Sequence, residues 1–113
     1  MVEVGVIGKE CSINSGFTQS GWNNLKYRKI GKEVNVTGAV ITTAQTSWVK
    51  VISTLPSGFR PTLEVDTVCR TSWGQVMKVA ISSNGEISTL NLNDGNDLPS
   101  NEYIFINVTY FVD

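Results

Sequence analysis

The strongest constraint on the fold comes from one segment with two prolines, Leu55-Pro56-Ser57-Gly58-Phe59-Arg60-Pro61. Its two prolines each hold φ near about −65° and bracket Ser57-Gly58, so the segment is excluded from the interior of a helix or strand. Runs rich in β-formers flank it, at 48–53 and 63–71. Because Leu55 and Phe59 are too apolar for an ordinary surface turn, we expect both to reach the core. We call this segment the corner and predict that it carries the chain from one sheet to the other.

The clearest strand pattern upstream of the corner begins at Glu33. Two faces alternate there, with Val34, Val36, Gly38 and Val40 on one and Asn35, Thr37 and Ala39 on the other. Such alternation is typical of an antiparallel strand with a core face and a solvated face. Before it, we expect an opening strand at 2–7, a loop with at most a short strand at 8–21, and a tight turn at 30–32.

Downstream of the corner, Met77, Val79 and Ile81 share one face of a β-run at 75–82. Asn84-Gly85 stands between this run and the next, which is the strongest short-range signal for a hairpin. No segment keeps a helical apolar period for three turns. About eight short strands, with turn signals about every 8–12 residues, predict an all-β fold, an antiparallel β-sandwich or jelly-roll-like domain.

The last strand, at 103–112, is apolar on both faces. One face carries Ile104, Ile106, Val108, Tyr110 and Val112, and the other carries Tyr103, Phe105 and Phe111. In an antiparallel fold such a strand is either central to the sandwich or covered by another subunit.

Length and charge exclude several classes of protein. The chain has 113 residues, 41% of them hydrophobic, and a formal net charge of −1. These values fit one globular domain and argue against disorder and against nucleic-acid binding. No apolar run is long enough to cross a membrane, and 1–4 lacks the layout of a signal peptide, so we expect neither membrane insertion nor export by that route.

Cysteine and histidine usage narrows the chemistry further. Histidine is absent, which removes histidine-dependent triads and most zinc sites. Cys11 and Cys69 lack metal-like spacing; a disulfide between them is possible, but two free, buried thiols are favoured.

No catalytic constellation is recognisable, so we predict a binding protein and not an enzyme, with no cofactor and no bound metal. A glycosidase pair could come from Glu64, Asp66, Asp94 and Asp97, but spacing in sequence does not bring two of them together. The oxygens at 94–97 resemble calcium ligands, yet the spacing of an EF-hand loop is missing.

Sugar recognition needs less: an aromatic plate and a few planar donors and acceptors. For Trp22, beside Gly21, a structural plug is favoured over a binding role. For Trp48, at the start of a strand, core or intersubunit packing is favoured. Trp73 lies in a small-residue turn near Arg70 and is the best candidate for an exposed plate.

The sequence resembles the C-terminal head domains of bacteriophage tail-fibre and baseplate receptor-binding proteins, including those of lactococcal phages and other phages of Gram-positive bacteria. The similarity spans about 90 residues. Each matching segment alone is weak evidence, but together they make a chance match improbable: 21–22, 25–31, 34–38, 54–61, 81–87 and the strand around Tyr103. Within the chain, we expect 1–20 to be an N-terminal strand and loop leading into a head domain at 21–113.

The resemblance implies a homotrimer of β-sandwich heads at the tail tip or baseplate of a virion, made in the host cytoplasm and assembled with other tail proteins. It implies binding to host surface saccharide, either cell-wall polysaccharide or a teichoic-acid-like glycan, without catalysis. Two features depart from the family. Lactococcal heads use a histidine that this chain lacks, and the neck and shoulder regions are missing, as expected of a short protein or an excised head.

The family segments are scaffold, so the binding residues are expected in loops. We predict a saccharide site made of Trp73, Arg70, Asp66, Asn93, Asp94 and Asp97. Asp66 and Arg70 would share one face of a regular strand. Two alternatives stay open: a structural tail or baseplate module without ligand, and a non-viral carbohydrate-binding module or adhesin.

Overall fold

The computed structural model describes residues 7–43, 50–72, 74, 76–90 and 99–112. These residues form nine strands and no helix, which confirms the all-β prediction. The strands are β1 (Ile7–Glu10), β2 (Phe17–Gln19), β3 (Lys26–Ile30), β4 (Glu33–Thr42), β5 (Lys50–Thr54), β6 (Val65–Thr71), β7 (Val76–Ile81), β8 (Glu86–Leu90) and β9 (Tyr103–Phe111). In this part of the chain, no helix is long and apolar enough to cross a membrane.

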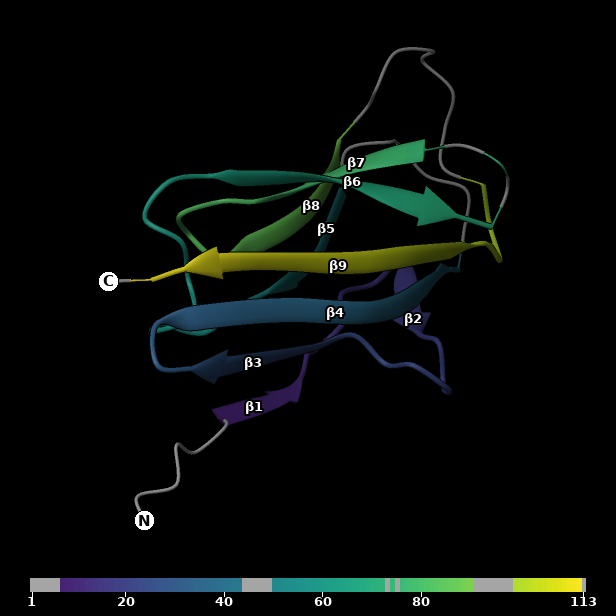
Figure 1. Ribbon diagram of the computed structural model, residues 1–113. Coiled ribbons are helices and arrows are strands. Elements are labelled where there is room, and N and C mark those ends of the chain that lie inside the picture. The colour runs from purple at the N-terminus through teal and green to yellow at the C-terminus, as the bar shows by residue number, and fades with distance from the viewer. Residues whose placement is uncertain (1–6, 44–49, 73, 75, 91–98, 113) are drawn as a thin grey trace.

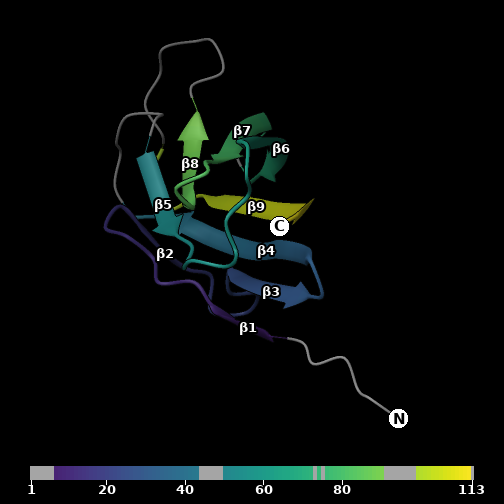
Figure 2. The same cartoon turned by 90° about the vertical axis from the view of Figure 1, so that its left-hand side faces the viewer.

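All nine strands belong to one hydrogen-bonded antiparallel sheet, in the order β1-β3-β4-β9-β6-β7-β8-β5, with β2 beside β4 (Figure 1). The sheet curls so that β5 and β8 run steeply across the direction of β3, β4 and β9 (Figure 2). The two layers of the predicted β-sandwich are therefore two parts of one curved sheet. The opening strand expected at 2–7 lies mostly outside the described residues, and the structure has β1 and β2 in the segment that we expected to be mainly loop.

The inner face of the curl holds the core. β4 buries Val34, Val36 and Val40, and β7 buries Met77, Val79 and Ile81, as the alternation predicted. Ala39 is the exception on the outer face of β4, because it is completely buried. Its backbone pairs with the connection between β2 and β3, which covers it: Ala39 N–H donates to the carbonyl of Asn23 at 2.7 Å.

β9 lies between β4 and β6, in the interior of the sheet. Of the two explanations for its second apolar face, a central strand or cover by another subunit, the structure shows the central strand. It pairs with β4 from Tyr103 to Phe111, but with β6 only at Arg70↔Phe105 and Thr71↔Ile104. Beyond these two pairs β6 diverges from β9 (Figure 1).

The corner packs against the inner face, as predicted. Leu55 is 1% exposed, and the Phe59 ring meets Tyr27 edge-on at 4.7 Å between centroids. The Tyr110 hydroxyl donates to the Phe59 carbonyl at 2.5 Å. The corner follows β5, which is the last strand in the sheet order, and it contacts Tyr27 on β3 and Tyr110 on β9. It therefore links strands that are not neighbours in the sheet.

Three further predictions are confirmed. The hairpin at Asn84-Gly85 joins β7 and β8, the turn at 31–32 joins β3 and β4, and Cys11 and Cys69 are free, buried thiols.

Candidate functional site

The predicted saccharide site is only partly within the described residues. Trp73, Asn93, Asp94 and Asp97 lie outside them, as does Trp48. Asp66 and Arg70 are both described, exposed and on the outer face of β6, so the predicted shared face is present.

Asp66 already has partners. Its carboxylate lies 3.1 Å from the ammonium of Lys78 on β7, and it also interacts with Glu64. The hydrogen bond from Lys78, and then the one shared with Glu64, lower the pKa of the Asp66 carboxyl. The same hydrogen bond and the charge of Asp66 raise the pKa of Glu64. Asp66 is thus a charge-paired surface carboxylate.

Arg70 lies near a different set of side chains. Its guanidinium carbon is 4.3 Å from the centroid of the Phe105 ring on β9. Four residues along an extended strand span about 13 Å, so Arg70 and Asp66 lie at different points along β6. Arg70 lies beside Phe105, whereas Asp66 is paired with Lys78.

Phe105, Tyr103 and Trp22 form a continuous group of rings that we call the aromatic surface. The Tyr103 and Phe105 rings stack with centroids 6.0 Å apart and 10° between their planes. The Trp22 ring lies 6.1 Å from Tyr103 and 6.3 Å from Phe105. Trp22 is 64% exposed, so interpreting it as a structural plug was wrong.

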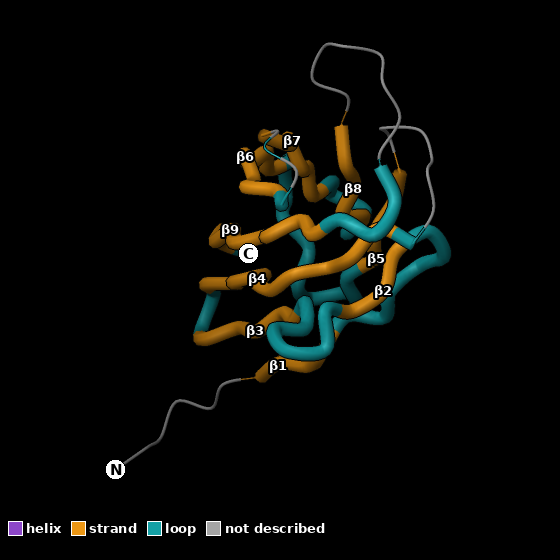
Figure 3. Tube along the Cα trace, turned by 90° about the vertical axis from the view of Figure 1, so that its right-hand side faces the viewer, coloured by secondary structure: helices purple, strands orange, loops and turns teal. Residues whose placement is uncertain are grey.

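The loop that carries Trp22 joins β2 to β3 and is the teal segment between them in Figure 3. Short polar bonds shape it: Gly21 N–H donates to Asn24 Oδ1 at 2.8 Å, and Asn23 N–H donates to Ser20 Oγ at 3.0 Å. These bonds, with the Ala39–Asn23 bond, hold the loop against β4, and the indole of Trp22 lies at the surface.

The sequence favoured a structural plug for Trp22 because a tryptophan next to glycine before a strand is more often packed than displayed. The signal was its neighbourhood: Ser20, Gly21, Asn23 and Asn24 are turn formers, typical of a surface loop. What decides the exposure is the pairing of this loop with β4, which a local pattern does not contain.

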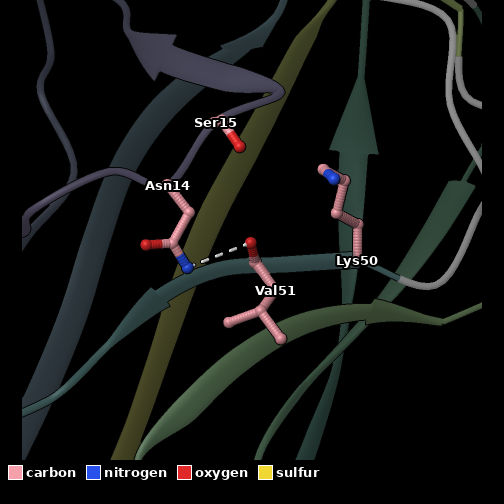
Figure 4. Close-up of a pocket in the computed structure, with 4 residues that line it drawn as sticks. All are labelled: Asn14, Ser15, Lys50 and Val51. Atoms are coloured by element: carbon pink, nitrogen blue, oxygen red, sulfur yellow. Dashed lines mark hydrogen bonds between the residues drawn. The ribbon is translucent and has the colours of Figure 1, made fainter.

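A second region of the surface is a pocket of about 530 Å³ lined by Asn14, Ser15, Lys50 and Val51 (Figure 4). Asn14 Nδ2 donates to the carbonyl of Val51 at 3.3 Å, so the amide is partly used. Lys50 makes no ion pair with another described residue. No aromatic residue is among the described lining residues, so this pocket offers donors and a positive charge but no stacking face.

No group of three or more acidic, cysteine or histidine side chains that could hold a metal ion occurs in the part of the chain that the structure describes. The same part of the chain presents aromatic faces, amides, carboxylates and cations at the surface.

This fold is that of the head domains of bacteriophage receptor-binding proteins, as the resemblance in sequence implied. The head domain of lactococcal phage bIL170, described as a receptor-binding domain, superimposes with a TM-score of 0.73 at 18% identity, over 96% of this chain and 99% of that chain. The receptor-binding protein of Listeria phage PSA matches with a TM-score of 0.65 at 18% identity, over 94% of this chain and 66% of that one. No family model and no curated protein matches the sequence.

Proposed function

We propose that this protein is the receptor-binding head of a phage tail and that it attaches the virion to a saccharide on the host surface. The observation that carries the proposal is the aromatic surface beside Arg70 on a fold shared with two phage receptor-binding proteins. Trp22 is exposed and lies against the half-buried rings of Tyr103 and Phe105. Sugars are a natural partner for such a surface because the apolar face of a pyranose packs on an aromatic ring.

Arg70 extends the proposal to anionic glycans. It makes no hydrogen bond or ion pair with another described residue, so its N–H groups are available to a ligand. A guanidinium binds a phosphate in a bidentate manner, and it would therefore favour a glycerol-phosphate or other teichoic-acid-like polymer over a neutral glycan. The function is binding alone, with no catalytic step.

The remaining parts of the proposal follow from the same fold. The head would be homotrimeric, would sit at the tail tip or baseplate with other tail proteins, and would use Trp73, Asn93, Asp94 and Asp97 as additional saccharide contacts. Asp66 would contribute only where a ligand extends along β6, since its carboxylate is paired with Lys78.

The test is binding of the purified full chain to a glycan array of bacterial surface polysaccharides and teichoic acids, together with its ability to block phage adsorption. We expect binding to one glycan class and competition for adsorption. A chain that bound no glycan and no cells, yet was found in virions, would instead be a structural tail module, and the proposed function would be wrong.

Trp73 has a paired test of its own. We expect Trp73→Ala to weaken glycan binding while the free energy of unfolding stays within about ±0.5 kcal/mol, as for a surface position. Unchanged binding would eliminate Trp73 from the site, and a large drop in melting temperature would assign it to the core.

A further inference from the structure

Beside the aromatic surface lies a small polar pocket that the sequence did not predict. It has a volume of about 270 Å³ and is lined by Glu10, Gly21, Trp22, Asn23, Asn24 and Lys26. Pockets for drug-sized ligands hold about 300–1,000 Å³, so this one matches a single sugar unit and not a whole oligosaccharide. We call it the Trp22 pocket.

The frame of the Trp22 pocket is held by hydrogen bonds within the chain. Asn24 Nδ2 donates to Glu10 Oε1 at 3.0 Å, which fixes one wall. Below it, Gln19 Nε2 donates to the carbonyls of Cys11 and Leu25 at 3.0 and 3.1 Å, and Gln19 Oε1 accepts from Leu25 N–H at 2.6 Å. The ends of β1 and β3 are therefore fixed before any ligand arrives.

Two polar side chains of the pocket are not used by this frame. The amide of Asn23 and the ammonium of Lys26 make no hydrogen bond or ion pair with other described residues. Glu10 has one carboxylate oxygen engaged by Asn24 and keeps further acceptor capacity. An exposed indole with a free amide, a free ammonium and a half-used carboxylate around it offers both donors and acceptors.

We propose that the Trp22 pocket is a monosaccharide subsite, built from residues outside the set predicted for saccharide binding. One pyranose ring stacks on Trp22, its hydroxyls bond to Asn23 and to Glu10, and Lys26 donates to a ring or hydroxyl oxygen. The site rests on the proposed saccharide-binding function and assigns part of it to Trp22, Asn23, Glu10 and Lys26, none of which belongs to the predicted saccharide set.

Gly38 is a positioning residue for this subsite. It has a φ of 141°, and a Cβ there would lie 2.4 Å from the carbonyl oxygen of Asn24 and 2.5 Å from the Cα of Leu25. Only glycine lets β4 approach the loop so closely, and this approach sets the place of Trp22 relative to Lys26.

The experiment compares the full-length wild type with Trp22→Ala, Trp22→Phe, Asn23→Ala and Lys26→Gln on the same glycan array, followed by titration with the glycan that binds best. We expect Trp22→Ala to weaken binding by roughly tenfold, and Trp22→Phe to recover most of it, because a ring face remains. Lys26→Gln and Asn23→Ala should each weaken it by about threefold to tenfold.

Lys32→Gln is the matched control, since Lys32 is equally exposed but lies on the turn between β3 and β4, away from the pocket. It makes the same change in net charge and should bind like the wild type. Lys26→Gln and Asn23→Ala remove no hydrogen bond within the described chain, so their melting temperatures should stay unchanged.

The outcomes are distinguishable. If the wild type binds a glycan and both Trp22→Ala and Lys26→Gln bind it equally well, the subsite is wrong while the proposed function stands. If Trp22→Ala loses glycan binding and also changes the sedimentation of the protein, Trp22 belongs to a contact with a second copy, and the subsite is again overturned. A wild type that binds no glycan overturns both proposals.

Discussion

Arg70 is an exposed side chain that we expect to contribute little to stability and much to specificity. A cation–π contact at an exposed site contributes about 0.5–1 kcal/mol. We expect Arg70→Gln to lower the free energy of unfolding by no more than that, while it abolishes any preference for phosphate-bearing over neutral glycans. Binding of both glycan types at several salt concentrations measures this. Arg28→Gln, an exposed arginine on β3, is the control, and an unchanged preference in Arg70→Gln would contradict the role.

Cys11 and Cys69 make stability depend on pH in the alkaline range. Burial raises the pKa of each thiol from 9.0 to about 11, against a smaller lowering by a hydrogen bond with Ser53 for Cys11 and with the Asn107 backbone for Cys69. The folded state then keeps protons that the unfolded chain loses, so the free energy of unfolding should fall as pH rises from about 9 to 11.

Urea unfolding at several pH values across that range measures the fall. Replacing both cysteines with alanine should make it shallower but not remove it, because burial also raises the pKa of the Tyr110 hydroxyl. The wild-type thiols should not react with a thiol reagent at pH 8, since buried thiols stay protonated. An equal fall in the double variant would assign the pH dependence to other groups.

At the scale of elements, the corner joins parts of the sheet that are not neighbours. Lys29 Nζ donates to the Gly58 carbonyl at 2.9 Å, and the Phe59 ring contacts Tyr27. Gly58 itself has a φ of 94° and little around the place of a Cβ, where the nearest atom is Lys29 Nζ at 3.8 Å. The requirement for glycine is thus in the backbone conformation and not in the available space.

Gly58→Val should therefore destabilise the fold by about 1–2 kcal/mol or more, the cost of a side chain in a left-handed conformation. Gly58→Asn should cost less, because asparagine tolerates positive φ. Thermal melting and glycan binding are measured together. If Gly58→Val kept its stability but lost binding, the corner would be part of the site and not of the scaffold.

On the scale of the whole molecule, the second apolar face of β9 divides into two parts. Phe105 is half-buried and packs within its own chain against Tyr103, Trp22 and Arg70. Phe111 is 72% exposed and pairs with Glu33 on β4. Glu33 in turn pairs with Ile30 on β3, which is 44% exposed. The apolar end formed by Phe111 and Ile30 has no cover within the described chain and is a candidate contact between subunits.

We predict a homotrimer in solution. A polar residue at Phe105 should dissociate or unfold the head, and Phe111→Ser is the cleaner test because it disturbs no ring contact among the described residues. Burying an apolar side chain contributes roughly 1.5–3 kcal/mol per subunit, enough to shift assembly at micromolar concentration. Sedimentation measures the state, with Lys9→Gln, an exposed lysine on β1, as a surface control. A stable wild-type monomer at that concentration would refute the trimer.

Most of the strands of this protein are predictable from local sequence patterns. Alternation at Val34, Val36 and Val40, the hairpin at Asn84-Gly85 and the proline-bracketed corner are local signals, because side-chain period and turn conformation depend on neighbours along the chain. They were sufficient for the all-β class and for the core faces of β4 and β7, whereas β9 is apolar on both faces and its environment stayed open. Burial of the two thiols followed from composition and the absence of a metal spacing.

Which surface residues meet depends on contacts that form only in the folded chain. Two separate sheets and one curled sheet have the same local pattern, since the difference lies in which strand edges pair. Whether Trp22 is displayed or buried depends on how its loop crosses Ala39, and whether Arg70 acts with Asp66 or with Phe105 depends on the divergence of β6 from β9. These are contacts between residues far apart in the chain, and no local spacing encodes them.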